Sequence, residues 1–142
     1  MLFRSTTDLL IDVNGYFAAP GTGGLSLYPT LPCRVLDTRS GNGAFSGTLS
    51  PPVDVLGSPC GVASQSQTYV FNATVLPQGL LGYLTLWPYG QNQPGVSTLN
   101  ASDGAITSNM AIVAAGTQGK VNAYAGTGTT NLLLDISAFF AP

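Results

Sequence analysis

Charged side chains are scarce in this chain, and those that could do chemistry fall into one cluster and two apolar segments. Arg34, Asp37 and Arg39 form the cluster, while Asp12 and Asp135 each lie inside an apolar run that predicts a β-strand. A carboxylate buried in such a strand is costly unless a cation pairs with it. We therefore expect Asp135 to meet Arg34 or Arg39 inside the domain, where the ion pair would fix the register of the strands.

The sequence offers no convincing catalytic group. Asp37, Asp103 and Asp135 could supply the carboxylates of a glycoside hydrolase, but nothing marks one of them as the proton donor. A nucleophilic Ser or Cys needs a neighbouring base, and the chain has no His and a single lysine, Lys120, in a predicted turn. The glycine-rich run 21–24 lacks the Lys-Ser/Thr pair of a phosphate-binding loop. We expect neither an enzyme nor a cofactor.

The candidate metal ligands are also incomplete. Residues 12–15, Asp-Val-Asn-Gly, resemble half of a calcium loop, but the corresponding residues 135–138 lose the pattern. With no His and only Cys33 and Cys60, a zinc site is nearly excluded. We favour a disulfide between the two cysteines over two buried free thiols. The disulfide would contribute about 3.5 kcal/mol in the chain-entropy model and would imply an oxidising compartment.

An aromatic group offers a different kind of site. Tyr83 and Trp87 lie four residues apart on one face of a predicted strand, and Tyr89 follows the bend at Pro88. Together the three rings could form a platform for a sugar ring of a polysaccharide. They could equally cover an edge of the core or lie in a subunit contact, where Trp and Tyr are enriched. A carbohydrate-binding module is therefore the alternative to the structural role developed below.

The composition narrows the class of protein. A chain of 142 residues with 44% hydrophobic content is one domain with a sizeable core. Only 7% of its residues are charged, against about 25% in typical domains. Low charge suits secreted or lattice-forming proteins, although a merely neutral surface would look the same. A net charge of −2 with four cations argues against nucleic acid, and no apolar run is long enough to predict a membrane span.

One segment occurs twice in the chain. Residues 5–19, STTDLLIDVNGYFAA, match residues 128–142, GTTNLLLDISAFFAP, at a constant offset. One domain needs that strand once, so the other copy belongs to a neighbour, either in a tandem array or in a second copy of the protein. We expect residues 1–19 to leave the domain through a Gly/Pro linker at 20–29. The residues predicted to pair with the next copy are Leu9, Leu10, Ile11, Asp12, Val13, Tyr16 and Phe17.

Such pairing would be strand addition, in which main-chain hydrogen bonds and alternating side chains join an extended segment to a sheet edge. Donor and acceptor are different surfaces, so copies would join head-to-tail into a filament or array. A blander alternative is that the segment folds back onto its own domain as an extra edge strand.

The remaining pattern predicts an all-β domain over residues 30–142. Short runs rich in Val, Leu, Ile, Thr and Tyr alternate with Gly/Pro turns, which is typical of an antiparallel β-sandwich or jelly roll of seven to nine strands. In one run Tyr69, Phe71, Ala73 and Val75 share a face. Residues 40–66 hold no convincing strand. The expected strands are 8–18, 33–37, 67–76, 81–87, 96–100, 105–114, 120–125 and 130–140.

Several motifs in order give the chain a resemblance to a known class of repeat. They are PCRVLDTR at 32–39, SPCG at 58–61, GYLTLWPYGQNQP at 82–94, STLNASDG at 97–104 and LLLDISAFF at 132–140. Together they resemble a tandem repeat module of long secreted or surface bacterial proteins, which has no assigned activity. The segment LLIDVNGYF looks like the closing strand of a preceding repeat. The resemblance implies a β-sandwich and an extracellular or cell-surface location, but it implies no function.

Overall fold

The computed structural model describes residues 11, 13, 15–19 and 21–142 of the chain, and it confirms the predicted all-β class. Every strand pair is antiparallel, and eight strands form one continuous hydrogen-bonded sheet that folds over on itself. The strands are β1 (Ser26–Asp37), β2 (Phe45–Thr48), β3 (Val53–Asp54), β4 (Thr68–Pro77), β5 (Leu81–Pro88), β6 (Leu99–Ala101), β7 (Thr107–Ala114) and β8 (Lys120–Ala141); two short 3-10 turns, η1 (Thr38–Ser40) and η2 (Thr117–Gly119), interrupt them.

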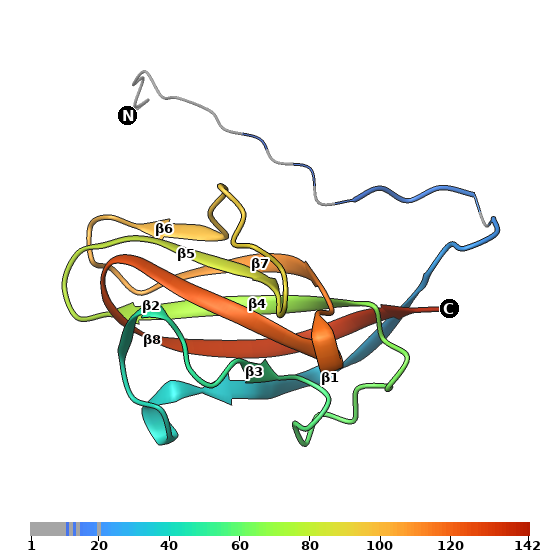
Figure 1. The fold of residues 1–142 in the computed structure, drawn as a ribbon, viewed down its shortest axis with the longest axis horizontal. Helices are drawn as coiled ribbons and strands as arrows, with labels where there is room; N and C mark the ends of the chain where they lie inside the picture. Colours follow the sequence, from blue (N-terminus) through green and yellow to red (C-terminus); the bar gives the residue numbers. More distant parts are fainter. Residues whose placement is uncertain (1–10, 12, 14, 20) are drawn as a thin grey trace, which may run out of the picture.

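Strand β8 organises the whole fold, as Figure 1 shows by its long course through both layers. The sequence predicted two strands, 120–125 and 130–140, separated by a turn at Gly126–Gly128. The structure instead has one strand of 22 residues with a corner at that point. Thr127 and Gly128 there take φ angles of 57° and 139°, which bend the strand while its hydrogen-bond pairing continues on either side.

The corner of β8 divides the sheet into two layers. Before the corner, β8 pairs with β5 on one edge and with β3 and part of β2 on the other; β6 then extends the layer beyond β5. After the corner, β8 pairs with β4 on one edge and with β1 on the other, and β7 extends that layer beyond β4. The result is a sandwich-like fold in which a single strand is central to both layers.

The core lies between the two layers and follows the alternation of the strands. Tyr69, Phe71, Ala73 and Val75 of β4, which were predicted to share a face, are all fully buried. The Tyr69 hydroxyl donates a hydrogen bond to the Gly119 carbonyl at 2.9 Å. Burial raises the pKa of this hydroxyl to about 12, with a smaller effect from the charge of Asp54, so it remains a neutral donor.

Two parts of the predicted organisation differ from the structure. The linker expected over 20–29 ends at residue 25, because β1 begins at Ser26 and not near residue 33. Pro29 and Pro32 are tolerated in this strand because β1 lies at a sheet edge, where a strand can lack main-chain donors. The region 40–66, expected to be strand-free, contains the short strands β2 and β3.

Four strand ends meet at one end of the second layer. Ser26 at the start of β1 lies opposite Ala141 at the end of β8. Thr68 at the start of β4 lies opposite both Phe140 of β8 and Ala114 at the end of β7. We call this the entry end, because the N-terminal segment joins the domain here and the chain also ends here (Figure 1).

Candidate functional site

The charged cluster joins β1 to β8. Arg34 lies directly opposite Asp135 in the register of the two strands, and its Nε and Nη2 donate hydrogen bonds to the two carboxylate oxygens. Asp37 accepts from Arg39 Nη2 at 2.6 Å and from Arg34 Nη1 at 3.2 Å. The expected pairing of Asp135 with an arginine is therefore present. It lies on the outer face of the sheet and not inside the domain, since the Asp135 side chain is 27% exposed.

The electrostatics of this cluster suit a structural role. Hydrogen bonds from the Arg39 side chain, followed by its backbone N–H and the charges of both arginines, lower the pKa of Asp37 to about 2. The hydrogen bond to Asp135 raises the pKa of Arg34. Asp37 and both arginines are thus held in their charged forms at neutral pH, and an acid or base for catalysis needs a pKa nearer the working pH.

A buried threonine strengthens the contact between β1 and β8, and no sequence pattern pointed to it. Thr38 is fully buried next to the charged cluster. Its Oγ1 donates to the Asn131 side-chain oxygen at 3.1 Å and accepts from the Leu132 backbone N–H at 3.0 Å. The Cys33–Cys60 disulfide, present as predicted, ties β1 to the loop before β4. This side of the sandwich is therefore fastened by covalent, ionic and hydrogen-bonded links.

The three aromatic rings do not form the expected open platform. Trp87 is 6% exposed, and its Nε1 donates to the Gln91 carbonyl at 3.0 Å. Tyr83 stacks on Tyr124 of β8, with ring centroids 5.9 Å apart, and only Tyr89 is exposed. For Trp87 the structure matches the alternative in which the ring covers part of the core, because the loop after β5 folds back over this face of the strand.

The described apolar side chains of the N-terminal segment are mostly exposed. Leu9, Leu10 and Asp12 of the predicted strand over 8–18 lie outside the described residues. Its described residues are not in a strand. The exposed fractions of the described apolar side chains are 76% for Ile11, 84% for Val13, 89% for Tyr16 and 79% for Phe17.

The Phe17 ring lies 6.0 Å from Phe140, centroid to centroid, and this places the segment at the entry end. The other described apolar side chains of the segment, those of Ile11, Val13 and Tyr16, are exposed to water.

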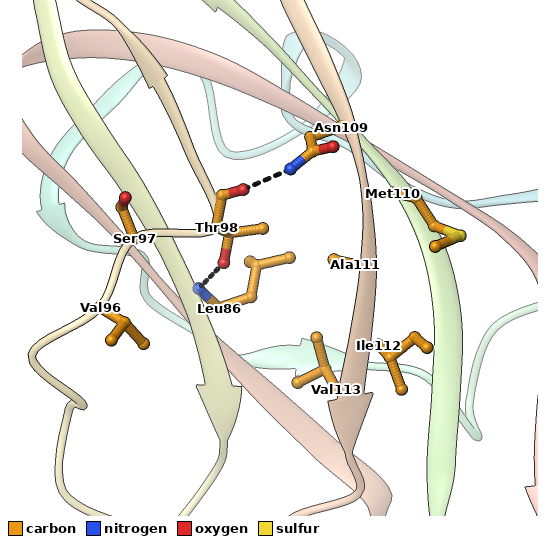
Figure 2. A pocket seen from close by; sticks show the side chains of 9 residues that line it. All are labelled: Leu86, Val96, Ser97, Thr98, Asn109, Met110, Ala111, Ile112 and Val113. Carbon is orange, nitrogen blue, oxygen red and sulfur yellow. Dashed lines mark hydrogen bonds between the residues drawn. The ribbon is translucent and has the colours of Figure 1, made fainter. Parts of the chain in front are cut away.

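On the side of the sandwich away from β1, β2 and β3, a groove lies between the two layers. Its walls are β7 and residues 96–98, which precede β6, and Figure 2 shows Leu86 between them. The Asn109 side-chain amide donates to the Thr98 carbonyl at 2.8 Å and bridges the two walls at one end. The groove encloses about 250 Å³, whereas a water molecule occupies about 30 Å³ of liquid. It is large enough for aliphatic side chains.

The sequence predicted β7 as a strand, over 105–114, but not as the wall of a groove. Strand order decides which strand is left at an edge, and strand order is a long-range property. The sequence does contain a local signal of an unprotected edge strand. β7 reads Thr-Ser-Asn-Met-Ala-Ile-Val-Ala, with neither a charge nor a proline to prevent pairing with another strand.

Within the part of the chain that the structure describes, no helix has the length and apolarity needed to cross a bilayer, and no group of three or more acidic, His or Cys side chains could hold a metal ion. Comparison with protein-family models, with curated proteins and with solved structures found no match to this chain.

Proposed function

We propose that this protein is a non-enzymatic structural module whose N-terminal segment joins one copy to the next, head-to-tail, in a filament or array. The observation that carries the proposal is the exposure of Ile11, Val13, Tyr16 and Phe17, each at 76% or more, in a segment with the sequence of a core strand. Burying an aliphatic or aromatic side chain contributes about 1.5–3 kcal/mol. The segment therefore gains stability from a neighbouring surface that covers it.

The position of the second copy of this sequence supports pairing outside the domain. Residues 133–140 of β8 lie between β1 and β4, which pair with its two edges. Leu132, Leu134 and Ile136 of that copy are fully buried. The place that this sequence occupies in the fold is thus already filled by the chain itself, and the N-terminal copy has no equivalent place left in its own domain.

The charge of the chain favours close packing of copies. With four cations, six anions and a net charge of −2, little repulsion opposes association at neutral pH. The Cys33–Cys60 disulfide fits an oxidising compartment. We therefore place the assembly outside the cytoplasm, at the cell surface or in the extracellular space.

Deletion of residues 1–19 tests the proposal. The full chain should form particles whose size grows with concentration in light scattering and which appear as strings in negative-stain electron micrographs. The shortened chain should remain at a single small size. Its far-UV circular dichroism and melting temperature should match those of the full chain, because the described residues of the segment add no strand to the fold. Long polymers formed by the shortened chain would refute the proposal.

Polysaccharide binding has less support. It predicts a monomer that loses affinity when Trp87 is replaced by Ala, yet Trp87 is buried beneath the loop that follows β5. Glycan pull-down with the full chain and with Trp87→Ala separates the two functions, and we expect no retention of either protein.

A further inference from the structure

The described strands differ in how open their outer edges are. β1 has a free edge, but it carries Pro29 and Pro32, which cannot donate hydrogen bonds, and its pairing with β8 shifts register twice. β2, β3 and β6 have two to four residues each, too few for a long ladder. β7 is paired with β4 alone, over eight consecutive positions from Thr107 to Ala114 without a register shift. β7 is therefore the longest regular edge available to an incoming strand.

The edge of β7 lacks the usual protection against strand addition. Natural edge strands carry charges, prolines or bulges that prevent pairing with another chain. β7 has none of these, and Met110 on its outer face is 65% exposed. An incoming strand could pair with the main-chain N–H and C=O groups on the outer edge of β7. Such pairing would bury no charged side chain of β7, because the strand has none.

The groove beside β7 offers places for side chains of alternate residues. Ala111 and Val113 point from β7 toward Leu86, while Met110 and Ile112 lie on the other face of β7, as Figure 2 shows. A strand added along β7 would place every second side chain in this groove and the others on the outer face.

The sequence of the N-terminal segment matches this alternation. Leu9, Ile11 and Val13 share one face and are all aliphatic, whereas the other face is mixed and carries Leu10, Asp12, Asn14 and Tyr16. The aliphatic face would enter the groove, and the mixed face would lie on the solvent side, beside the outer face of β7 on which Met110 is exposed. Neither the groove nor β7 has a charged residue that would be buried without a partner.

Geometry favours pairing between copies over pairing within one chain. β7 runs toward the entry end. If residues 9–17 folded back onto β7 of their own chain while Phe17 stayed beside Phe140, they would also run toward the entry end. That arrangement is parallel, which is slightly less stable per residue than antiparallel pairing.

An antiparallel arrangement within one chain would place residue 17 at the far end of β7. The linker 18–25 would then cross a diagonal of about 31 Å, estimated from about 24 Å for the seven Cα–Cα steps of an eight-residue strand and four strand spacings of about 4.8 Å. The nine steps from residue 17 to residue 26 reach at most about 32 Å, so the linker would have to be fully extended and would lose the turn closed by the hydrogen bond from Gly24 N–H to the Gly21 carbonyl.

From these observations we propose that the acceptor for residues 9–17 is the free edge of β7, together with the groove beside it, on a second copy of the chain, and that the added strand runs antiparallel to β7. This inference rests on the proposed function and specifies which surface receives the donor segment.

Cysteine cross-linking between two full-length variants tests the acceptor. Both native cysteines are in a disulfide, so an introduced thiol is the only one in each chain. One variant carries Val13→Cys, and its partner carries Ala111→Cys or Val113→Cys on the groove face of β7. Mixing under mild oxidation should give a covalent dimer of the two variants on a non-reducing gel. The matched control partner carries Leu31→Cys on β1, which is 88% exposed and should cross-link no more than random collision allows.

The outcomes separate the acceptor from the proposed function. Preferential cross-linking to Leu31→Cys would overturn the β7 assignment while leaving head-to-tail association intact. A single chain carrying both Val13→Cys and Val113→Cys that cross-links internally at high dilution would overturn pairing between copies. Absence of any association by the unmodified full chain would overturn the proposed function itself.

A charge on the edge gives a second test that does not depend on thiol geometry. Met110→Lys places a cation on an exposed position of β7, as natural edge strands do, and should raise the concentration needed for assembly on the order of tenfold. Leu31→Lys on β1 is the control and should leave that concentration unchanged. Equal effects of the two variants would contradict the assignment of β7 as the acceptor.

Discussion

The two copies of the repeated segment have nearly the same sequence and opposite surroundings. In β8, Leu134 and Ile136 are fully buried between β1 and β4. At the corresponding positions of the N-terminal copy, Ile11 and Val13 are 76% and 84% exposed. A strand-forming sequence becomes a strand only where neighbouring edges are vacant, and the domain offers this sequence one such place.

The copy in β8 is also held by contacts from β1. Arg34 pairs with Asp135, and Thr38 accepts from the Leu132 backbone. These links make β8 hard to displace, so an incoming copy of the same sequence gains more from a free edge than from replacing β8. The experiments that follow test this difference, from the largest expected effect to the smallest.

The matched variants Ile136→Ala and Val13→Ala should show the largest difference in stability between the two copies of the segment. Ile136 is fully buried, and its truncation should lower the free energy of unfolding by about 2–5 kcal/mol. Val13 is exposed, and its truncation should change that free energy by less than about 0.5 kcal/mol. Chemical denaturation of dilute protein measures both. Similar losses in the two variants would mean that the N-terminal copy is buried within its own domain.

Removal of the disulfide should loosen the region around β1. Cys33 and Cys60 are separated by 27 residues in sequence, and in the chain-entropy model closing such a loop contributes about 3.5 kcal/mol. The double variant Cys33→Ser/Cys60→Ser should lose a comparable free energy of unfolding in denaturant titration, while Val13 and its neighbours stay as exposed to limited proteolysis as before. Unchanged stability would indicate that β1 is held to β8 by other contacts.

The hydroxyl of Thr38 should contribute less than the disulfide to the free energy of unfolding. Thr38→Val keeps the shape of the side chain but leaves the Leu132 N–H without its acceptor in a buried place. The expected loss is about 1–3 kcal/mol, again measured by denaturation. Thr48→Val, at an exposed position of β2, serves as the control for the substitution itself and should be nearly neutral.

The ion pairs predict a weak dependence of stability on pH. The folded-state pKa of Asp37 is about 2, below its ordinary value of about 3.9. The folded protein therefore binds fewer protons at this site, and the resulting stability is present above about pH 4 and is lost as the pH falls toward 2. Melting temperatures of the native chain and Asp37→Asn should converge over that range. A constant difference down to pH 2 would contradict the pairing.

Sequence reasoning succeeded where a single residue had few partners available. Asp135 lies in an apolar strand of a chain with four cations, so an arginine was the natural partner. Alternation along β4 likewise identified its buried face, because that face is decided within one strand.

It failed where the outcome depends on distant parts of the chain. The corner at Thr127 and Gly128 was expected to end a strand, and only the continuing pairs with β4 and β5 show that it does not. Alternation left open whether Trp87 faces solvent or covers the core, and the loop after its strand covers it. The groove beside β7 could not be foreseen, because edge position follows from the order of strands in the complete sheet.

Sedimentation velocity of the full chain beside the double variant Ile11→Asp/Val13→Asp tests the central proposal most directly. The variant keeps every residue of the domain and adds charge only to exposed positions of the donor segment. We predict a concentration-dependent series of large species for the native chain and a single monomer peak for the variant, with identical circular dichroism. Equal sedimentation of the two proteins over the whole concentration range would contradict assembly through this segment.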